Sequence, residues 1–222
     1  MNVDLPAAVL GVPKDKKGRN TMARVTPIPL ADFSSEARRA FAGLAPSDAR
    51  YRRPDATGRP TGANILGVLA HHPDLAKAYC TFNGHLLMNT TLSERQREMV
   101  ILRVGAVRES SYEWSQHLSL AQDAGLSDAE IGCVSFGPEA PIWEELDSVV
   151  LKTVDELLLD GEISAKSWER LAAQFTTQQI LDLIFTVGSY DTMSKMTKSL
   201  KVELDSDLAD FVSAIVRGGT AS

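Results

Sequence analysis

The chain has 222 residues and a formal net charge of −6 at pH 7, with a sequence pI of about 5.3. This length suits one large domain or two small ones, and the acidic balance argues against general nucleic-acid binding. No apolar run approaches the roughly 18 residues that a bilayer-spanning helix needs. The first 22 residues make a poor signal peptide, because Asp4 lies near the start and the apolar stretch at 7–12 is short. We therefore expect a cytoplasmic protein without a membrane segment.

Residues 1–30 are predicted to form an irregular N-terminal arm, followed by a single helical domain at 31–222. The arm carries a charge run at 14–20, which indicates either simple disorder or a segment that embraces a neighbouring subunit. A first helix is predicted at 32–44, with Ala37, Phe41 and Leu44 facing inward. The loop at 46–62 contains four arginines, among them Arg59, so it is either an anion-binding lid or a polar connection.

From Asn64 onward the pattern is helical almost without a break, and no alternating strand pattern occurs. Pro73 begins a helix with apolar residues in a stripe at Leu75, Tyr79, Phe82 and Leu86. Four pairs have the spacing of a capping box and predict helix starts, namely Ser93 with Gln96, Ser110 with Glu113, Ser127 with Glu130 and Thr176 with Gln179. The fold class is therefore predicted to be all-α.

The most informative cluster consists of Glu98, Glu113 and His117. Glu113 lies four residues before His117, so on a helix the two side chains share a face and can touch. An imidazole held by carboxylates can transfer protons near neutral pH. Structural alternatives exist for each residue, because Glu113 can complete the capping box with Ser110, Glu98 can pair with Arg95, and a lone helical histidine is often structural.

Other candidate groups carry weaker signals. His71 and His72 are predicted to end a helix before Pro73, where the helix dipole favours histidine, and His72 is the one that could also reach the site. No His-Glu-x-x-His element, cysteine cluster or glycine-rich phosphate loop occurs, so we expect neither a metal nor a nucleotide cofactor. Cys80 and Cys133 stand far apart, and we expect two reduced, partly buried thiols.

Three segments together resemble the carboxymuconolactone decarboxylase family, which shares its fold with the alkylhydroperoxidase-D-like proteins. They read RQREMVILRV at 95–104, YEWSQH at 112–117 and AGLSDAEI at 124–131. The resemblance is strongest over residues 60–135, weaker to about 205, and absent from residues 1–30. It implies an alkylhydroperoxidase-D-like helical bundle that assembles into a homo-oligomer, a trimer or hexamer or else a dimer. The site would then lie among the central helices, close to a subunit interface.

The chain departs from the peroxidase branch of this resemblance at two positions. That branch has a glutamate, two cysteines separated by two residues, and a histidine four residues after the second cysteine. Glu98 and His117 match the outer two positions, whereas Ser110 and Glu113 replace the cysteines. Neither replacement can form a disulfide or a sulfenic acid, so dithiol peroxidase chemistry is lost. The Tyr-Glu-Trp-x-x-His form resembles the decarboxylase branch instead.

The resemblance implies a cofactor-independent carbon–carbon lyase or isomerase that acts on a small oxygenated carboxylate or lactone, as in the catabolism of aromatic compounds. His117, Glu98 and Glu113 would be catalytic, by general acid/base chemistry. The substrate would be held by Arg59, His72, Trp114 and Ser110. Two alternatives remain open: a non-catalytic oligomeric binding protein on the same fold, and a peroxidase-type redox protein that uses Cys80 or Cys133.

Overall fold

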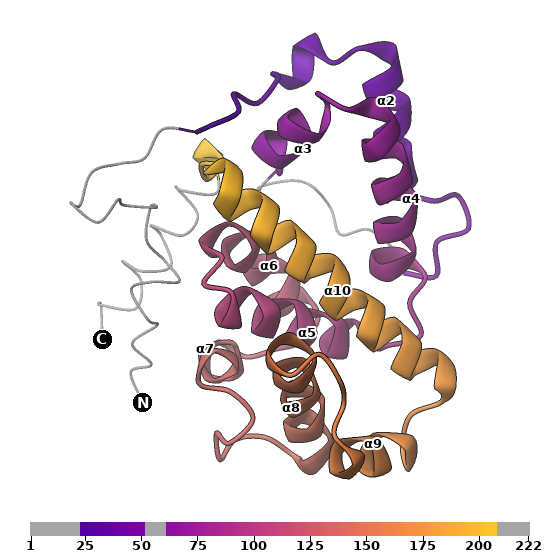
Figure 1. The fold of residues 1–222 in the computed structure, drawn as a ribbon, viewed down its shortest axis with the longest axis vertical. Helices are drawn as coiled ribbons and strands as arrows, with labels where there is room; N and C mark the ends of the chain where they lie inside the picture. Colours follow the sequence, from indigo (N-terminus) through magenta and orange to yellow (C-terminus); the bar gives the residue numbers. More distant parts are fainter. Residues whose placement is uncertain (1–22, 52–60, 208–222) are drawn as a thin grey trace, which may run out of the picture. The chain divides into compact units, whose positions relative to one another are not determined.

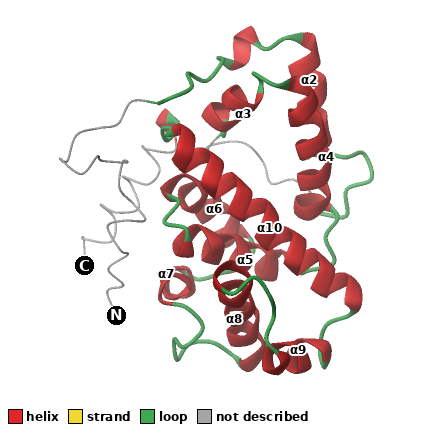
Figure 2. Ribbon diagram, in the orientation of Figure 1, coloured by secondary structure: helices red, strands yellow, loops and turns green. Residues whose placement is uncertain are grey.

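The structure is a computed structural model that describes residues 23–51 and 61–207. Within these ranges every regular element is a helix and no strand occurs, which confirms the all-α prediction (Figure 2). In the same residues, no helix combines the length and the apolar character that crossing a membrane requires. Most of the predicted arm, including its charge run, lies outside the described residues, and so does Arg59.

The chain divides into two compact units, each of which is described by itself. Of the described residues, the α4 unit comprises 23–51, 61–90 and 197–207, and the α5 unit comprises 91–196. The α4 unit contains the short 3-10 helices η1 (Leu30–Asp32) and η2 (Ala42–Leu44) and the helices α2 (Ser35–Phe41), α3 (Ala63–Leu69) and α4 (Pro73–Met88). The α5 unit contains α5 (Glu94–Val107), α6 (Ser111–Asp123), α7 (Asp128–Phe136), α8 (Glu145–Leu159), α9 (Ala165–Ala172) and most of α10 (Thr177–Leu200).

In the α4 unit, α4 packs against α2 and η2 through small residues. A Cβ added to Gly84 would overlap the carbonyl oxygen of Gly43, and one added to Gly43 would lie 2.8 Å from the backbone nitrogen of Thr81. The buried face of α4 therefore includes Ala76, Cys80 and Gly84, at intervals of four residues. The stripe predicted from the larger apolar residues is wrong in part, since Leu86 is buried whereas Leu75 and Phe82 are exposed.

In the α5 unit, α5 is the central helix and contacts α6, α7 and α8 (Figure 1). The run Met99–Val100–Ile101–Leu102 is fully buried. A helix that is apolar around its whole circumference belongs in the middle of a bundle. The polar residues Arg97 and Glu98, directly before this run, are buried with it, and that is where the candidate site begins.

Three of the four predicted capping boxes are confirmed. Ser93 and Ser127 each exchange hydrogen bonds with the residue three positions later, and Thr176 does so with Gln179. The fourth is wrong, because Ser110 is the N-cap residue of α6 but its side chain makes no cap hydrogen bond.

The turn between α5 and α6 explains why the Ser110 side chain does not cap α6, because the same residues end α5. The N–H of Ser110 donates to the carbonyl of Gly105 at 2.8 Å, and the N–H of Glu109 donates to that of Ala106 at 3.1 Å. This is the Schellman pattern, with Glu109 at φ 50° in the left-handed position that glycine usually takes. It leaves Ser110 with ψ 92°, against 156° at the regular cap Ser93. The turn thus fixes the Ser110 backbone and frees Glu113 to point inward.

Candidate functional site

Glu98 and His117 form a buried ion-paired contact between α5 and α6. His117 Nδ1 lies 2.7 Å from Glu98 Oε2, and the Glu98 side chain is 0% exposed. Burial alone would raise the pKa of Glu98, but the neighbouring His117 and Arg97 outweigh it and hold that pKa below its usual value. Since an ionised carboxylate only accepts hydrogen bonds, Nδ1 is the donor, and Nε2 is the ring nitrogen left for another partner.

The second oxygen of Glu98 has a different partner. Arg97 Nε donates to Glu98 Oε1 at 2.9 Å, and Arg97 is itself buried. The predicted pairing of Glu98 with Arg95 is wrong, because Arg95 binds Glu130 and Asp147. Adjacent residues on a helix point about 100° apart. Both members of an adjacent Arg–Glu pair can therefore be buried only where neighbouring helices cover a wide part of the helix surface, as they do at this point of α5. The charged pair Arg97–Glu98 directly before a fully apolar run is the signal that identifies Arg97.

Glu113 supplies a second carboxyl group, four residues before His117 on α6. It is buried, and its Oε1 has no hydrogen-bond partner among the described residues. Burial raises the pKa of Glu113 to about 7, and the charge of His117 opposes this rise only in part. Glu113 therefore keeps its proton to a much higher pH than Glu98, whose pKa is lowered.

An aromatic ring completes the described surroundings of His117. Tyr190, on α10, presents its ring at 85° to the imidazole, with the two centroids 5.1 Å apart. The sequence pattern did not single out Tyr190 as a site residue, since an aromatic residue in a helical stripe is usually core. Two predicted substrate contacts are buried here as well: Ser110 is 1% exposed and Trp114 is 0% exposed. The Trp114 Nε1 has no hydrogen-bond partner within the described part of the chain.

Other predicted residues make contacts of their own within their unit. His72 belongs to the α4 unit, where its Nδ1 accepts from the N–H of Leu75 at 3.3 Å. The sequence suggested that His72 caps the end of the preceding helix. In the structure it caps the start of α4 instead. Cys80 and Cys133 are free thiols, as expected, and burial raises the pKa of Cys80 to about 11. In the described ranges no three His, Cys, Asp or Glu side chains gather in a way that could hold a metal ion.

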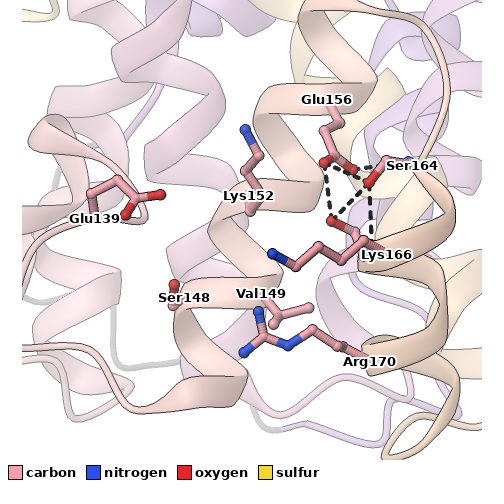
Figure 3. A pocket seen from close by; sticks show the side chains of 9 residues that line it. Glu139, Ser148, Val149, Lys152, Glu156, Ser164, Lys166 and Arg170 are labelled. Atoms are coloured by element: carbon pink, nitrogen blue, oxygen red, sulfur yellow. Dashed lines mark hydrogen bonds between the residues drawn. The ribbon is translucent and has the colours of Figure 1, made fainter.

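A hollow of about 130 Å³ lies between α8 and α9, and none of the predicted site residues lines it (Figure 3). Its central carboxylate, Glu156, accepts hydrogen bonds from the Ser164 N–H, the Ser164 hydroxyl and the Ser167 hydroxyl. These contacts fix the start of α9. Arg170, on the rim, pairs with Glu145 at 2.7 Å. Glu156, Ser164 and Ser167 thus bind one another, which is the pattern of a structural contact.

Comparison with protein families supports the resemblance seen in the sequence. Residues 73–142 match the model of the carboxymuconolactone decarboxylase family. This range contains α4 to α7 and with them Glu98, Glu113 and His117. Comparison with curated proteins gives no match.

Solved structures share the fold at low sequence identity. The debrominase Bmp8, in a cysteine-to-alanine variant bound to 2,3,4-tribromopyrrole, is 12% identical and has a TM-score of 0.67 over 88% of this chain and 98% of its own. An uncharacterised peroxidase-related protein from Ralstonia eutropha, described as an alkylhydroperoxidase AhpD core, is 16% identical, with a TM-score of 0.60 over 74% and 96% of the two chains.

A protein of unknown function from Agrobacterium tumefaciens, a suggested antioxidant-defence protein AhpD, is 19% identical, with a TM-score of 0.58 over 62% of this chain and 94% of its own. At these identities the likeness shows the fold. Residues 73–142 thus match the carboxymuconolactone decarboxylase family, and the fold of the chain is the alkylhydroperoxidase-D-like helical bundle.

Proposed function

We propose that this protein is a carbon–carbon lyase or isomerase of the carboxymuconolactone decarboxylase type, acting on a small oxygenated carboxylate or lactone. The observation that carries the proposal is the buried contact of 2.7 Å between His117 Nδ1 and Glu98 Oε2. A carboxylate that binds one ring nitrogen fixes the tautomer and leaves the other nitrogen to act on a substrate. The family match over this segment supports the same reaction class.

The two carboxyl groups support different roles because their environments differ. Glu98, held ionised by His117 and Arg97, orients the imidazole and stabilises its protonated form. Glu113, whose pKa burial raises to about 7, can hold or release a proton close to neutral pH. Two carboxyl groups whose pKa values are pushed apart are a recurrent arrangement for acid/base catalysis.

In the proposed reaction the substrate's own conjugated carbonyl accepts the electrons. The bond between the carboxylate carbon and the ring breaks, CO2 leaves, and the electron pair moves into the carbonyl as an enolate. His117, in its protonated form, then delivers a proton to carbon, Glu113 restores that proton, and Glu113 is reprotonated from solvent, so that one solvent proton is consumed for each CO2 released. The same groups suit proton abstraction next to a carbonyl, which is the step that an isomerisation needs. Beyond these side chains and the substrate, the decarboxylation as written consumes one proton from solvent.

The direct test is turnover of carboxymuconolactone, followed by release of CO2 and by NMR of the product. His117→Gln should lower kcat by about 10²–10⁴-fold, the range that a positioned acid/base group contributes. The matched control is His85→Gln, the same substitution at an exposed histidine of α4, which should leave kcat unchanged. Circular dichroism verifies that both variants keep the helical fold.

Two outcomes would count against the proposal. An unchanged kcat in His117→Gln would remove the imidazole from the reaction. Saturable binding of carboxymuconolactone and related lactone acids without turnover by the wild-type protein would favour the non-catalytic binding protein instead. The proposal also includes a homo-oligomer, which rests on the family assignment and which light scattering of the purified protein tests directly.

A further inference from the structure

Arg97 occupies an unusual position for an arginine. Its side chain is only 8% exposed, and its Nε donates to Glu98 Oε1 at 2.9 Å while His117 occupies the other oxygen of the same carboxylate. Its second ion pair, from NH2 to Glu94 Oε2, is longer at 3.7 Å and reaches a half-exposed partner. Of these two ion pairs, the short, buried one joins Arg97 to the carboxylate that orients the imidazole.

The charge balance of this buried group depends on Arg97. Glu98 is fully buried, and a buried carboxylate is stable only beside a compensating positive charge. A guanidinium remains protonated at every pH at which a protein is folded. With Arg97 present, Glu98 is neutralised whether or not His117 carries a proton. Without it, the imidazolium is the one close positive partner of an ionised Glu98 among the described residues, which favours the protonated ring.

The other groups that face the imidazole do not supply this compensation. Glu113, on α6, is neutral below pH 7 and negative above it, so it can only favour the imidazolium. Tyr190, on α10, contributes the edge-to-face contact of an uncharged ring. On α5, Glu98 contacts the imidazole and Arg97 contacts Glu98. Arg97 is the cation of this pair.

We propose that Arg97 is a positioning residue that neutralises Glu98 in place of His117, so that the imidazole can lose and regain its proton during turnover. The catalytic meaning of this inference rests on the proposed function, whereas the electrostatic claim stands independently of it. Arg97 acts through Glu98, and we assign it no contact with the substrate.

The test is a pH titration of the His117 ring by ¹H–¹⁵N NMR in protein labelled with ¹⁵N-histidine. The chain has four histidines, and the His117 signals are identified by their loss in His117→Gln. In Arg97→Gln the ring should keep its proton to higher pH than in the wild type, by about one pH unit or more, or tenfold in proton affinity. Arg97→Lys keeps the charge and should titrate within about half a pH unit of the wild type. Arg39→Gln, at an exposed arginine of α2, is the matched control and should change nothing.

Each outcome decides the proposal. A titration of His117 in Arg97→Gln that is unchanged would show that the arginine charge does not govern the ring. A shift to lower pH would show that Glu98, rather than His117, takes up the proton when the arginine is removed, and this too would overturn it. If Arg97→Gln does not fold, Arg97→Lys still decides, since a shift of one pH unit with the charge retained would contradict the charge argument. The titration needs no substrate, so absence of turnover would refute the proposed function without touching this inference.

Discussion

The pH dependence of stability gives a direct measure of the buried carboxyl group at Glu113. Burial raises the pKa of Glu113 from the ordinary value of 4.5 to about 7 in the folded protein. Between these two values the folded chain holds a proton that the unfolded chain has released. Unfolding therefore releases protons, and the free energy of unfolding falls as the pH rises through this window. At about 1.4 kcal/mol per pH unit, the total loss above pH 7 is about 3 kcal/mol.

Glu113→Gln replaces the neutral acid with an uncharged side chain of nearly the same shape, which has no proton to lose. The free energy of unfolding of the variant, minus that of the wild type, should therefore increase by about 2–3 kcal/mol between pH 5 and pH 8. With a urea dependence of about 2 kcal/mol per molar, this is a relative shift of about 1 M in the denaturation midpoint. Glu139→Gln, at an exposed glutamate, is the matched control.

The measurement is urea denaturation by circular dichroism at pH 5, 6, 7 and 8. Wild-type and Glu113→Gln curves that stay parallel over this range would refute the reasoning, because they would show that Glu113 ionises in the folded state as easily as in the unfolded state. A variant that loses stability relative to the wild type as the pH rises would contradict the sign of the argument.

Two further predictions follow from the backbone and are measured by urea denaturation. Glu109→Gly relieves a left-handed residue with φ 50° and should stabilise the protein by about 1 kcal/mol, whereas Glu109→Ala, which keeps the Cβ, should give no such gain. Gly84→Ala places a methyl group against the carbonyl oxygen of Gly43 and should destabilise by about 3 kcal/mol. Gly188→Ala, in open space on α10, should instead stabilise by about 0.5–1 kcal/mol, and equal effects at the two glycines would contradict the packing described for α4.

The sequence predicted several helix starts correctly, because the residues that fix a helix start interact over only a few positions. Pro73 begins α4, and the capping boxes at Ser93, Ser127 and Thr176 mark helix starts. Each of these depends on hydrogen bonds between residues three positions apart, or on the fixed φ of proline. Capping boxes and helix-starting prolines can therefore be recognised in the sequence before any tertiary contact is known.

The face that α4 buries depends on tertiary contacts, and the sequence pattern misidentified it. Larger apolar residues suggested a stripe through Leu75 and Phe82, yet the helix packs through Ala76, Cys80 and Gly84. Close approach of two backbones favours the smallest side chains, and that preference appears only once the partner segment is known. The charged pair Arg97–Glu98 before the apolar run was visible in the sequence, but the burial of Arg97 follows only from the helices that pack around α5.

The failed capping box at Ser110 bears on whether Glu113 has a chemical role. At Ser127 the same spacing places the glutamate at the helix start, where its carboxylate binds the backbone. At Ser110 the glutamate is instead buried, with one oxygen unpaired among the described residues and with a raised pKa. A side chain that breaks a local rule at a cost in stability is expected at functional sites. Glu113→Gln should therefore stabilise the protein at pH 8 and also lower kcat on carboxymuconolactone, whereas a gain in stability with an unchanged kcat would show that this carboxyl group transfers no proton during turnover.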